Sequence, residues 1–238
     1  MSDAILQVSN LSCYYDSIQA IENISLHVNQ GEIVAIIGAN GAGKSTMMKS
    51  VAGLLCPRSG SIRFKGAEIA GTPANKIIYK GISYVPEGRR LFSNLSVREN
   101  LELGAFKERD RSVIDERLER VFEMFPILKE RANQLAQTMS GGEQQMCAIA
   151  RGLMCAPELL MLDELSLGLM PSLVEKVLES VVQINKTGVT ILLVEQMVQE
   201  ALEISNRGYV IQVGKIVQEG SAQELLDSDE VRKAYMGM

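Results

Sequence analysis

The residues with the clearest chemical potential lie in a glycine-rich segment, GANGAGKS, at positions 38–45. The segment matches the pattern G-x-x-x-x-G-K-[S/T] in full. Its glycines permit backbone conformations in which successive N–H groups turn inward around an anion, and Lys44 would add a positive charge beside the β- and γ-phosphates of a nucleotide. The Ser45 hydroxyl would ligate Mg²⁺. The residues expected to hold the phosphate chain are Gly38, Ala39, Asn40, Gly41, Ala42, Gly43, Lys44, Ser45 and Thr46.

A second group of candidates ends the run LLMLDE at positions 159–164. Four apolar residues followed by two carboxylates are typical of a buried central strand whose carboxyl end faces the ligand crevice of an open α/β sheet. An acidic pair after a strand can also cap a helix, but the glycine-rich segment upstream favours a functional role. We expect Asp163 to hold Mg²⁺ through water and Glu164 to orient or deprotonate the water that attacks the γ-phosphate.

These residues must be positioned by alternating strands and helices. Residues 33–37 form a continuous apolar run, typical of a strand buried in a parallel sheet, and residues 46–55 are predicted to form the next helix. Residues 89–153 have a mostly helical pattern, and a short helix is expected at 223–226. The other expected strands are 5–8, 24–28, 61–64, 82–85, 159–162, 190–194, and a hairpin of 209–213 with 216–219.

This order predicts an α/β fold, namely a P-loop NTPase core with an antiparallel β layer and an inserted α-helical subdomain. The 238 residues would form a single domain. Its RecA-like core with the antiparallel β layer would comprise residues 1–86 and 158–238, and the helical subdomain would span residues 87–157.

Composition argues against several classes of protein. The chain has 24 basic and 29 acidic residues, a net charge of −5 and no basic block, so nucleic-acid binding is not expected. The four cysteines form no C-x-x-C pair and His27 is the single histidine, which argues against a zinc site. The N-terminus has no signal-peptide pattern, and no apolar run approaches the ~20 residues that span a bilayer, so we expect no transmembrane segment.

GANGAGKS, MSGGEQQ at 139–145 and LLMLDE resemble ABC-type ATPases in their order and spacing, over essentially the whole chain. The resemblance implies that the nucleotide is ATP and that two such subunits pack head to tail. Ser140, Gly141 and Gly142 would then bind the γ-phosphate of the ATP held by the partner, with the following helix directing its N-terminus at it. Ser140 is also expected to cap that helix in a capping box with Glu143.

The resemblance assigns two further features. Tyr15 is similar to the aromatic residue that stacks on adenine, and Tyr14 is the competing choice. Residues 166–169 (SLGL) are similar to the loop that contacts the opposite subunit.

Four positions depart from the commonest pattern of this family. Glu87 stands where most members have a glutamine, and we expect it to accept from the attacking water or to approach Mg²⁺. Gln196, which we count with Lys44 and Glu164 as catalytic, stands where a histidine is usual. Its amide can hydrogen-bond the γ-phosphate but cannot act as an acid or base near neutral pH. Glu143 replaces a glutamine. Leu165 replaces a proline, which would loosen the aim of Glu164.

Within the family, VPEGRRLF, MSGGEQQM, SLGL and LLVEQ resemble the smaller of two ATP-binding subunits of branched-chain amino-acid importers. This implies a second ABC ATPase subunit, in a heterodimer or a homodimer, two integral-membrane permease subunits, and indirectly an extracytoplasmic solute-binding protein. The chain would be peripheral, at the cytoplasmic face of the membrane. A short permease helix would dock beside the loop that carries Glu87. The candidate contacts are Gly88, Arg89, Arg90, Leu91 and Phe92, which would equally suit a solvated arginine pair followed by core residues.

Importers of urea or short amides use similar ATPase subunits and are the nearest alternative. The residues do not separate the two classes of importer, because the solute never touches this chain. Other functions fit the residues less well. An ABC ATPase outside transport would usually carry two cassettes or a long coiled-coil insertion and would favour a basic surface. A P-loop kinase or GTPase needs no MSGGEQQ, and the chain has no N-K-x-D for reading guanine.

Overall fold

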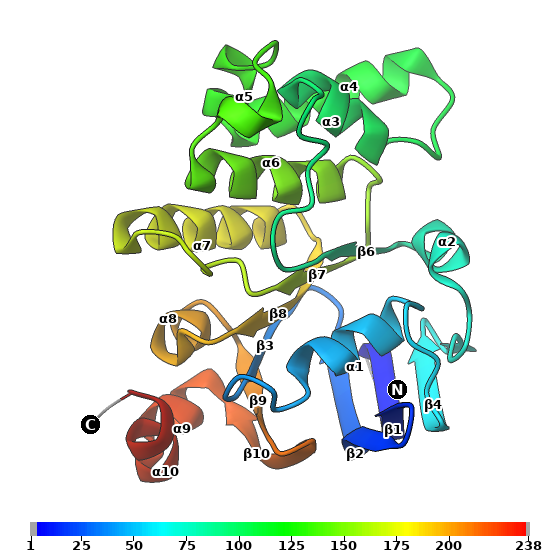
Figure 1. The fold of residues 1–238 in the computed structure, drawn as a ribbon, viewed down its shortest axis with the longest axis vertical. Coiled ribbons are helices and arrows are strands. Elements are labelled where there is room, and N and C mark those ends of the chain that lie inside the picture. Colours follow the sequence, from blue (N-terminus) through cyan, green and yellow to red (C-terminus); the bar gives the residue numbers. More distant parts are fainter. Residues whose placement is uncertain (1–3, 237–238) are drawn as a thin grey trace.

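The computed structural model describes residues 4–236, whose strands form two sheets with a lobe of helices at one end (Figure 1). An antiparallel sheet has the order β2-β1-β4-β5, and a six-stranded sheet has the order β10-β9-β3-β8-β7-β6. In the second sheet β9, β3, β8, β7 and β6 are parallel, and β10 is antiparallel to β9. The strands are β1 (Ala4–Tyr15), β2 (Ile18–Asn29), β3 (Ile33–Ile37), β4 (Ser59–Phe64), β5 (Ala67–Glu68), β6 (Ile82–Val85), β7 (Leu159–Asp163), β8 (Thr190–Glu195), β9 (Arg207–Gln212) and β10 (Lys215–Ser221).

Helices α3 to α6 make up the end lobe, and α7 lies between that lobe and the parallel sheet (Figure 1). The helices are α1 (Lys44–Val51), α2 (Ala74–Ile77), α3 (Val97–Gly104), α4 (Arg111–Met124), α5 (Pro126–Glu130), α6 (Gly141–Leu153), α7 (Pro171–Lys186), α8 (Val198–Glu203), α9 (Ala222–Asp227) and α10 (Asp229–Val231). Short 3₁₀ turns cover Ile78–Lys80 and Ala136–Thr138, and a π-helical turn covers Arg232–Met236. Within residues 4–236 every helix falls short of the length and apolar character that a membrane crossing demands.

The predicted fold class is confirmed, because a parallel core, an antiparallel layer and an inserted helical lobe are all present. The boundaries proposed for the core and the helical subdomain stay predictions.

The parallel strands separate two hydrophobic cores. Every residue of β3 is buried, and successive side chains point to opposite faces. Ile33, Ala35 and Ile37 pack in the core shared with α3, α4, α6 and α7, while Val34 and Ile36 pack in the core shared with α1 and the antiparallel sheet. Strands that are buried on both faces are continuously apolar, as the sequence pattern predicted. Packing on both faces holds the carboxyl ends of these strands in place between two layers.

Two predicted helical segments differ from the structure. The helix expected at 46–55 begins at Lys44 and ends at Val51. Gly53 stops it: its φ is +71°, and a Cβ there would lie 2.2 Å from the carbonyl oxygen of Thr72. The helical pattern assigned to 89–153 begins only at Val97, because residues 88–90 form a turn with three consecutive positive φ values.

Candidate active site

Strand order brings the candidate residues together. Strand β8 lies between β3 and β7, and in parallel strands the carboxyl ends meet at one edge of the sheet. The glycine-rich loop follows β3, Asp163 and Glu164 follow β7, and Gln196 follows β8. A cavity of about 380 Å³ opens beside them. It is lined by Tyr15, Ile18, Gln19, Ala20, Gly41, Gly43, Lys44, Ser45, Thr46, Glu164, Val213 and Gly214.

Two glycines of the loop, Gly38 and Gly43, leave no room for a side chain. Gly38 has a φ of +155°, and a Cβ there would lie 2.2 Å from the carbonyl oxygen of Ile211. Gly43 has a φ of +109°, and its Cβ would lie 2.6 Å from Cγ2 of Ile21. Helix α1 starts directly after Gly43 without a side-chain cap. Its first N–H groups are therefore available to an anion.

The other loop positions differ in their surroundings. Asn40 is exposed, whereas the side chain of Ala42 is buried in the core beside the antiparallel sheet. Gly41 lines the cavity, and Ala39 contributes its carbonyl group to Lys44. The loop thus presents backbone rather than side chains up to Lys44.

Lys44, Glu164 and Gln196, the three residues predicted to be catalytic, form one chain of contacts. The Lys44 side chain is only 3% exposed, and its Nζ donates to the carbonyl oxygens of Gly38 (2.8 Å) and Ala39 (3.1 Å). Nζ also lies 3.4 Å from Oε1 of Glu164. Nε2 of Gln196 donates to the other carboxylate oxygen, Oε2, at 2.6 Å. Both oxygens of Glu164 are therefore held by neighbours from other elements, namely Lys44 at the start of α1 and Gln196 directly after β8.

Ser45 and Asp163 form an oxygen-rich pair. The Ser45 hydroxyl donates to Oδ1 of Asp163 at 3.1 Å, and the Tyr84 hydroxyl donates to Oδ2 at 2.7 Å. Burial raises the pKa of Asp163 above its ordinary value, although these hydrogen bonds lower it. Burial and the neighbouring Asp163 also raise the pKa of Tyr84. A hydroxyl beside a carboxylate fits Mg²⁺, which binds few protein oxygens and keeps most of its waters.

Glu87 is not part of this group. It follows β6, its side chain is exposed, and within residues 4–236 no side-chain hydrogen bond or ion pair connects it to Ser45 or Asp163. That Glu87 accepts from the attacking water or approaches Mg²⁺ stays a prediction. The hydroxyl of Tyr84, from inside the same strand, contacts the second oxygen of Asp163 instead.

The segment 140–142 lies apart from the cavity, at the start of α6 in the lobe. The predicted capping box forms: Oγ of Ser140 accepts from the N–H of Glu143 at 3.4 Å, and the Glu143 carboxylate accepts from the N–H of Ser140 at 2.8 Å. Glu143 also pairs with Arg131 at 3.0 Å. Ser140 remains exposed, so its hydroxyl is accessible from outside this chain.

Sequence reasoning missed Tyr84 and Glu195. The only signal for Glu195 was its place at the end of a buried strand in LLVEQ, which parallels the acidic end of LLMLDE. Nothing in the local sequence indicated that Tyr84 would contact Asp163, because the two meet only through pairing of β6 with β7. Leu165 is fully buried and packs in the hydrophobic core. The expectation that it loosens the aim of Glu164 stays a prediction.

The two tyrosines that competed for the aromatic position have different surroundings. Tyr15 lines the cavity and is 44% exposed, whereas the ring of Tyr14 is covered by the guanidinium of Arg58, 4.7 Å from its centroid. An exposed ring beside the loop is available for stacking, and a ring that already contacts a cation is not.

We therefore expect Tyr15→Ala to raise the Kd for ATP about tenfold, because stacking on a base is worth about 1–3 kcal/mol. Titration with a fluorescent ATP analogue measures this change. Tyr14→Ala is the matched control and should leave the Kd close to that of the parent. The reverse order of effects would assign the stacking role to Tyr14.

Comparisons with known proteins agree with this geometry. The family model described as ABC transporter matches residues 21–166. The high-affinity branched-chain amino acid transport ATP-binding protein BraG of Pseudomonas aeruginosa is 48% identical over 98% of this chain and 100% of its own length. BraF, a second such ATP-binding protein of that organism, is 32% identical over 100% of this chain and 99% of its length. The ADP conformation of MJ1267, an ATP-binding cassette of an ABC transporter, superposes with a TM-score of 0.86 at 25% identity, covering 99% of both chains.

Proposed function

The chain belongs to the ABC transporter family, and from this premise we propose that it is the ATP-binding and ATP-hydrolysing subunit of an importer of branched-chain amino acids. The observation that carries the ATPase assignment is the contact chain Lys44–Glu164–Gln196 at the edge of the loop cavity. The similarity to BraG, over nearly the full length of both proteins, supports the class of solute.

In this proposal the loop backbone and Lys44 bind the β- and γ-phosphates of ATP, and Tyr15 stacks on adenine. Ser45 and Asp163 would hold Mg²⁺, which when bound neutralises charge on the phosphate oxygens. Glu164 orients and deprotonates the attacking water. Gln196 holds one carboxylate oxygen of Glu164 but cannot itself transfer a proton, so proton removal rests on Glu164.

We further propose that a second ABC ATPase subunit completes each site. Ser140, Gly141 and Gly142 would contact the ATP of that partner, and the exposure of Ser140 at the capped start of α6 supports this. The existence of two similar ATP-binding proteins, BraG and BraF, in one organism supports a heterodimer over a homodimer. Gln196 stands where a histidine is usual in the family, and this difference supports a dimer whose two ATP sites are unequal.

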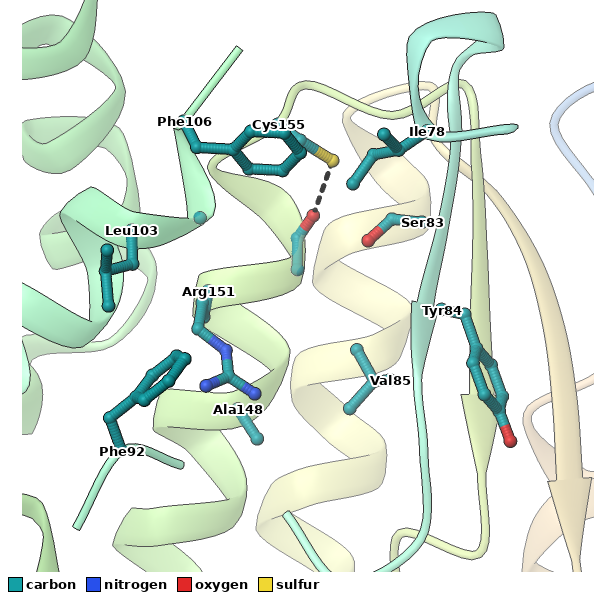
Figure 2. Close-up of a pocket in the computed structure, with 12 residues that line it drawn as sticks. Ile78, Ser83, Tyr84, Val85, Phe92, Leu103, Phe106, Ala148, Arg151 and Cys155 are labelled. Atoms are coloured by element: carbon teal, nitrogen blue, oxygen red, sulfur yellow. Dashed lines mark hydrogen bonds between the residues drawn. The ribbon is translucent and has the colours of Figure 1, made fainter. Parts of the chain in front are cut away.

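An apolar groove on the lobe supports a docking surface for a permease. The groove has a volume of about 390 Å³ and lies between α3, α6 and β6. Phe92, Leu103 and Phe106 lie on one side of it, α6 contributes Arg151, and Val85 lies opposite (Figure 2). The guanidinium of Arg151 lies 5.7 Å from the centroid of the Phe92 ring. Exposed aromatic residues beside an arginine are typical of protein interfaces.

Only Phe92 of the five predicted docking residues lines this groove. Gly88, Arg89, Arg90 and Leu91 line a neighbouring polar cavity of about 130 Å³. A short cytoplasmic helix of an integral-membrane permease would place apolar side chains against Phe92, Leu103 and Phe106, and would hold the chain at the cytoplasmic face of the membrane.

We expect Phe92→Asp to reduce recovery of the chain with its permease about tenfold, because a carboxylate would enter an apolar contact. ATP hydrolysis by the purified chain should not change. Val217→Asp is the control, because Val217 is 56% exposed on β10, close to the 55% of Phe92, but lies on a different surface. Equal recovery of permease with both variants would contradict this docking site.

The proposed function is tested by purifying the tagged chain from native membranes and identifying the proteins that accompany it. We expect an integral-membrane permease and a second ABC ATPase, and loss of leucine, isoleucine and valine uptake when the chain is deleted. Normal uptake of these amino acids together with lost uptake of urea or short amides would move the assignment to that class of importer. Recovery without any integral-membrane protein would favour an ABC ATPase outside transport.

A further inference from the structure

Glu195 is a buried carboxylate that the mechanism above does not use. It is the last residue of β8 and only 1% exposed. Within residues 4–236 no lysine, arginine or histidine side chain pairs with it. Burial raises its pKa to about 7. A carboxylate buried without a cation is unfavourable unless hydrogen bonds stabilise it, so the groups that donate to Glu195 indicate its role.

Those hydrogen bonds come mainly from one residue. The N–H of Ser166 donates to Oε1 of Glu195 at 3.0 Å, and the Ser166 hydroxyl donates to Oε2 at 2.5 Å. Ser166 is two residues beyond Glu164 and begins the loop at 166–169. Glu195 therefore holds the segment after Glu164 through two hydrogen bonds.

Gln196, the residue after Glu195, forms a hydrogen bond with Glu164 itself. Gln196 donates to Oε2 of Glu164, and the N–H of Glu164 donates to the carbonyl oxygen of Val194 at 2.8 Å. Three consecutive residues of one strand end therefore hold both ends of the turn 164–166. Leu165, which lies between Glu164 and Ser166 in the chain, is fully buried.

That turn needs to be held. Glu164 has a φ of +51°, a left-handed conformation that is unfavourable for a residue with a side chain and persists only where the surroundings enforce it. Release of Ser166 would let the turn relax, and the carboxylate of Glu164 would move with its backbone. Misplacement of a catalytic group by about 1 Å can lower a rate about 100-fold.

We propose that Glu195 is a positioning residue for ATP hydrolysis: by accepting both donors of Ser166, it fixes the turn that directs the Glu164 carboxylate at the γ-phosphate. The inference rests on the proposed function, because it requires Glu164 to activate the attacking water. It adds a role for a residue that would touch neither ATP nor water.

The test compares Glu195→Leu with Glu195→Gln in the chain assembled with its partner ATPase. Leucine has a similar volume but accepts no hydrogen bond, so we expect kcat to fall about 10- to 100-fold with little change in KM for ATP. Glutamine still accepts the N–H of Ser166 and should restore most of that rate. Ser166→Ala, which removes only the hydroxyl, should produce a smaller loss and serves if Glu195→Leu does not fold.

A double-variant cycle separates positioning from a general effect on structure. In a Glu164→Gln background, Glu195→Leu should cause little further loss, because there is no longer a base to aim. Parental kcat in Glu195→Leu, a further 10-fold loss in the Glu164→Gln background, or a failure of Glu195→Gln to restore the rate would overturn the proposal. Parental turnover by Glu164→Gln alone would instead overturn the ATPase mechanism.

Discussion

Lys44→Ala is expected to lose at least about 100-fold in ATP hydrolysis, the loss typical when a fixed donor to developing charge is removed. Nζ of Lys44 lies beside the cavity, next to the loop carbonyl groups and 3.4 Å from Glu164. Its charge would stabilise the γ-phosphate as the bond to the leaving oxygen breaks and the attacking water oxygen approaches phosphorus. Alanine also leaves the Glu164 carboxylate without its cation. The unpaired negative charge of this carboxylate would repel ATP from the site. Phosphate release at saturating Mg-ATP and equilibrium ATP titration measure the two effects.

The control is Lys176→Ala, which removes an exposed lysine from α7. It should hydrolyse ATP at the parental rate. Thermal unfolding of both variants shows whether the fold is kept, since Lys44 is buried and its removal also deletes a charge pair. Hydrolysis by a folded Lys44→Ala at the rate of Lys176→Ala would contradict the assignment of the loop as the ATP site.

Glu164→Gln should retain ATP binding while hydrolysis falls about 10²- to 10⁴-fold, the usual contribution of a positioned base. The amide keeps the shape of the side chain and an oxygen that can accept from Gln196, but it cannot take a proton from water. It also removes a negative charge near the γ-phosphate, so affinity for ATP should not decrease. Binding without turnover should accumulate an ATP-bound dimer, which size-exclusion chromatography with Mg-ATP detects.

Glu175→Gln makes the same chemical change at an exposed position of α7 and should hydrolyse ATP normally and form no stable dimer. Chromatography of Glu164→Gln with and without the second ABC ATPase distinguishes the two assemblies. A dimer that forms only with the second protein supports the heterodimer, and one that forms alone supports the homodimer. Parental turnover by Glu164→Gln would refute the role of Glu164 as the base.

The structure gives Glu143 and Leu165 local reasons for departing from the commonest family pattern. Glu143 both completes the cap of α6 and pairs with Arg131, so a carboxylate at this position links the start of α6 to the region after α5. Leu165 contributes a buried side chain that a proline would not supply in the same form. Gln196 keeps a donor to Glu164 but no titratable group. The glycine-rich loop at 38–45 lies beside the cavity, whereas the segment 140–142 lies apart from it at the start of α6.

Much of the fold could be predicted because the central strands have a simple pattern. The runs at 33–37, 159–162 and 190–194 are continuously apolar, and the structure contains strands that begin at the same residues. Helix ends were less predictable. Helix α1 ends early, before Gly53, because the distant backbone at Thr72 and Ala74 lies against that glycine. The turn at 88–90 places two arginines, Arg89 and Arg90, in left-handed backbone, which their residue type does not favour.

The sequence by itself determined the chemical groups of the candidate site: a glycine-rich loop with Lys44 and Ser45, and an acidic pair at the end of a buried strand. These follow from residue types at fixed spacing along the chain. Only the tertiary structure decided which side chains contact and orient these groups. Strand β8 between β3 and β7 brings Gln196 to Glu164 and Glu195 to Ser166, and β6 beside β7 brings Tyr84 to Asp163. These contacts join residues 29 to 79 positions apart, so strand order rather than sequence spacing sets them.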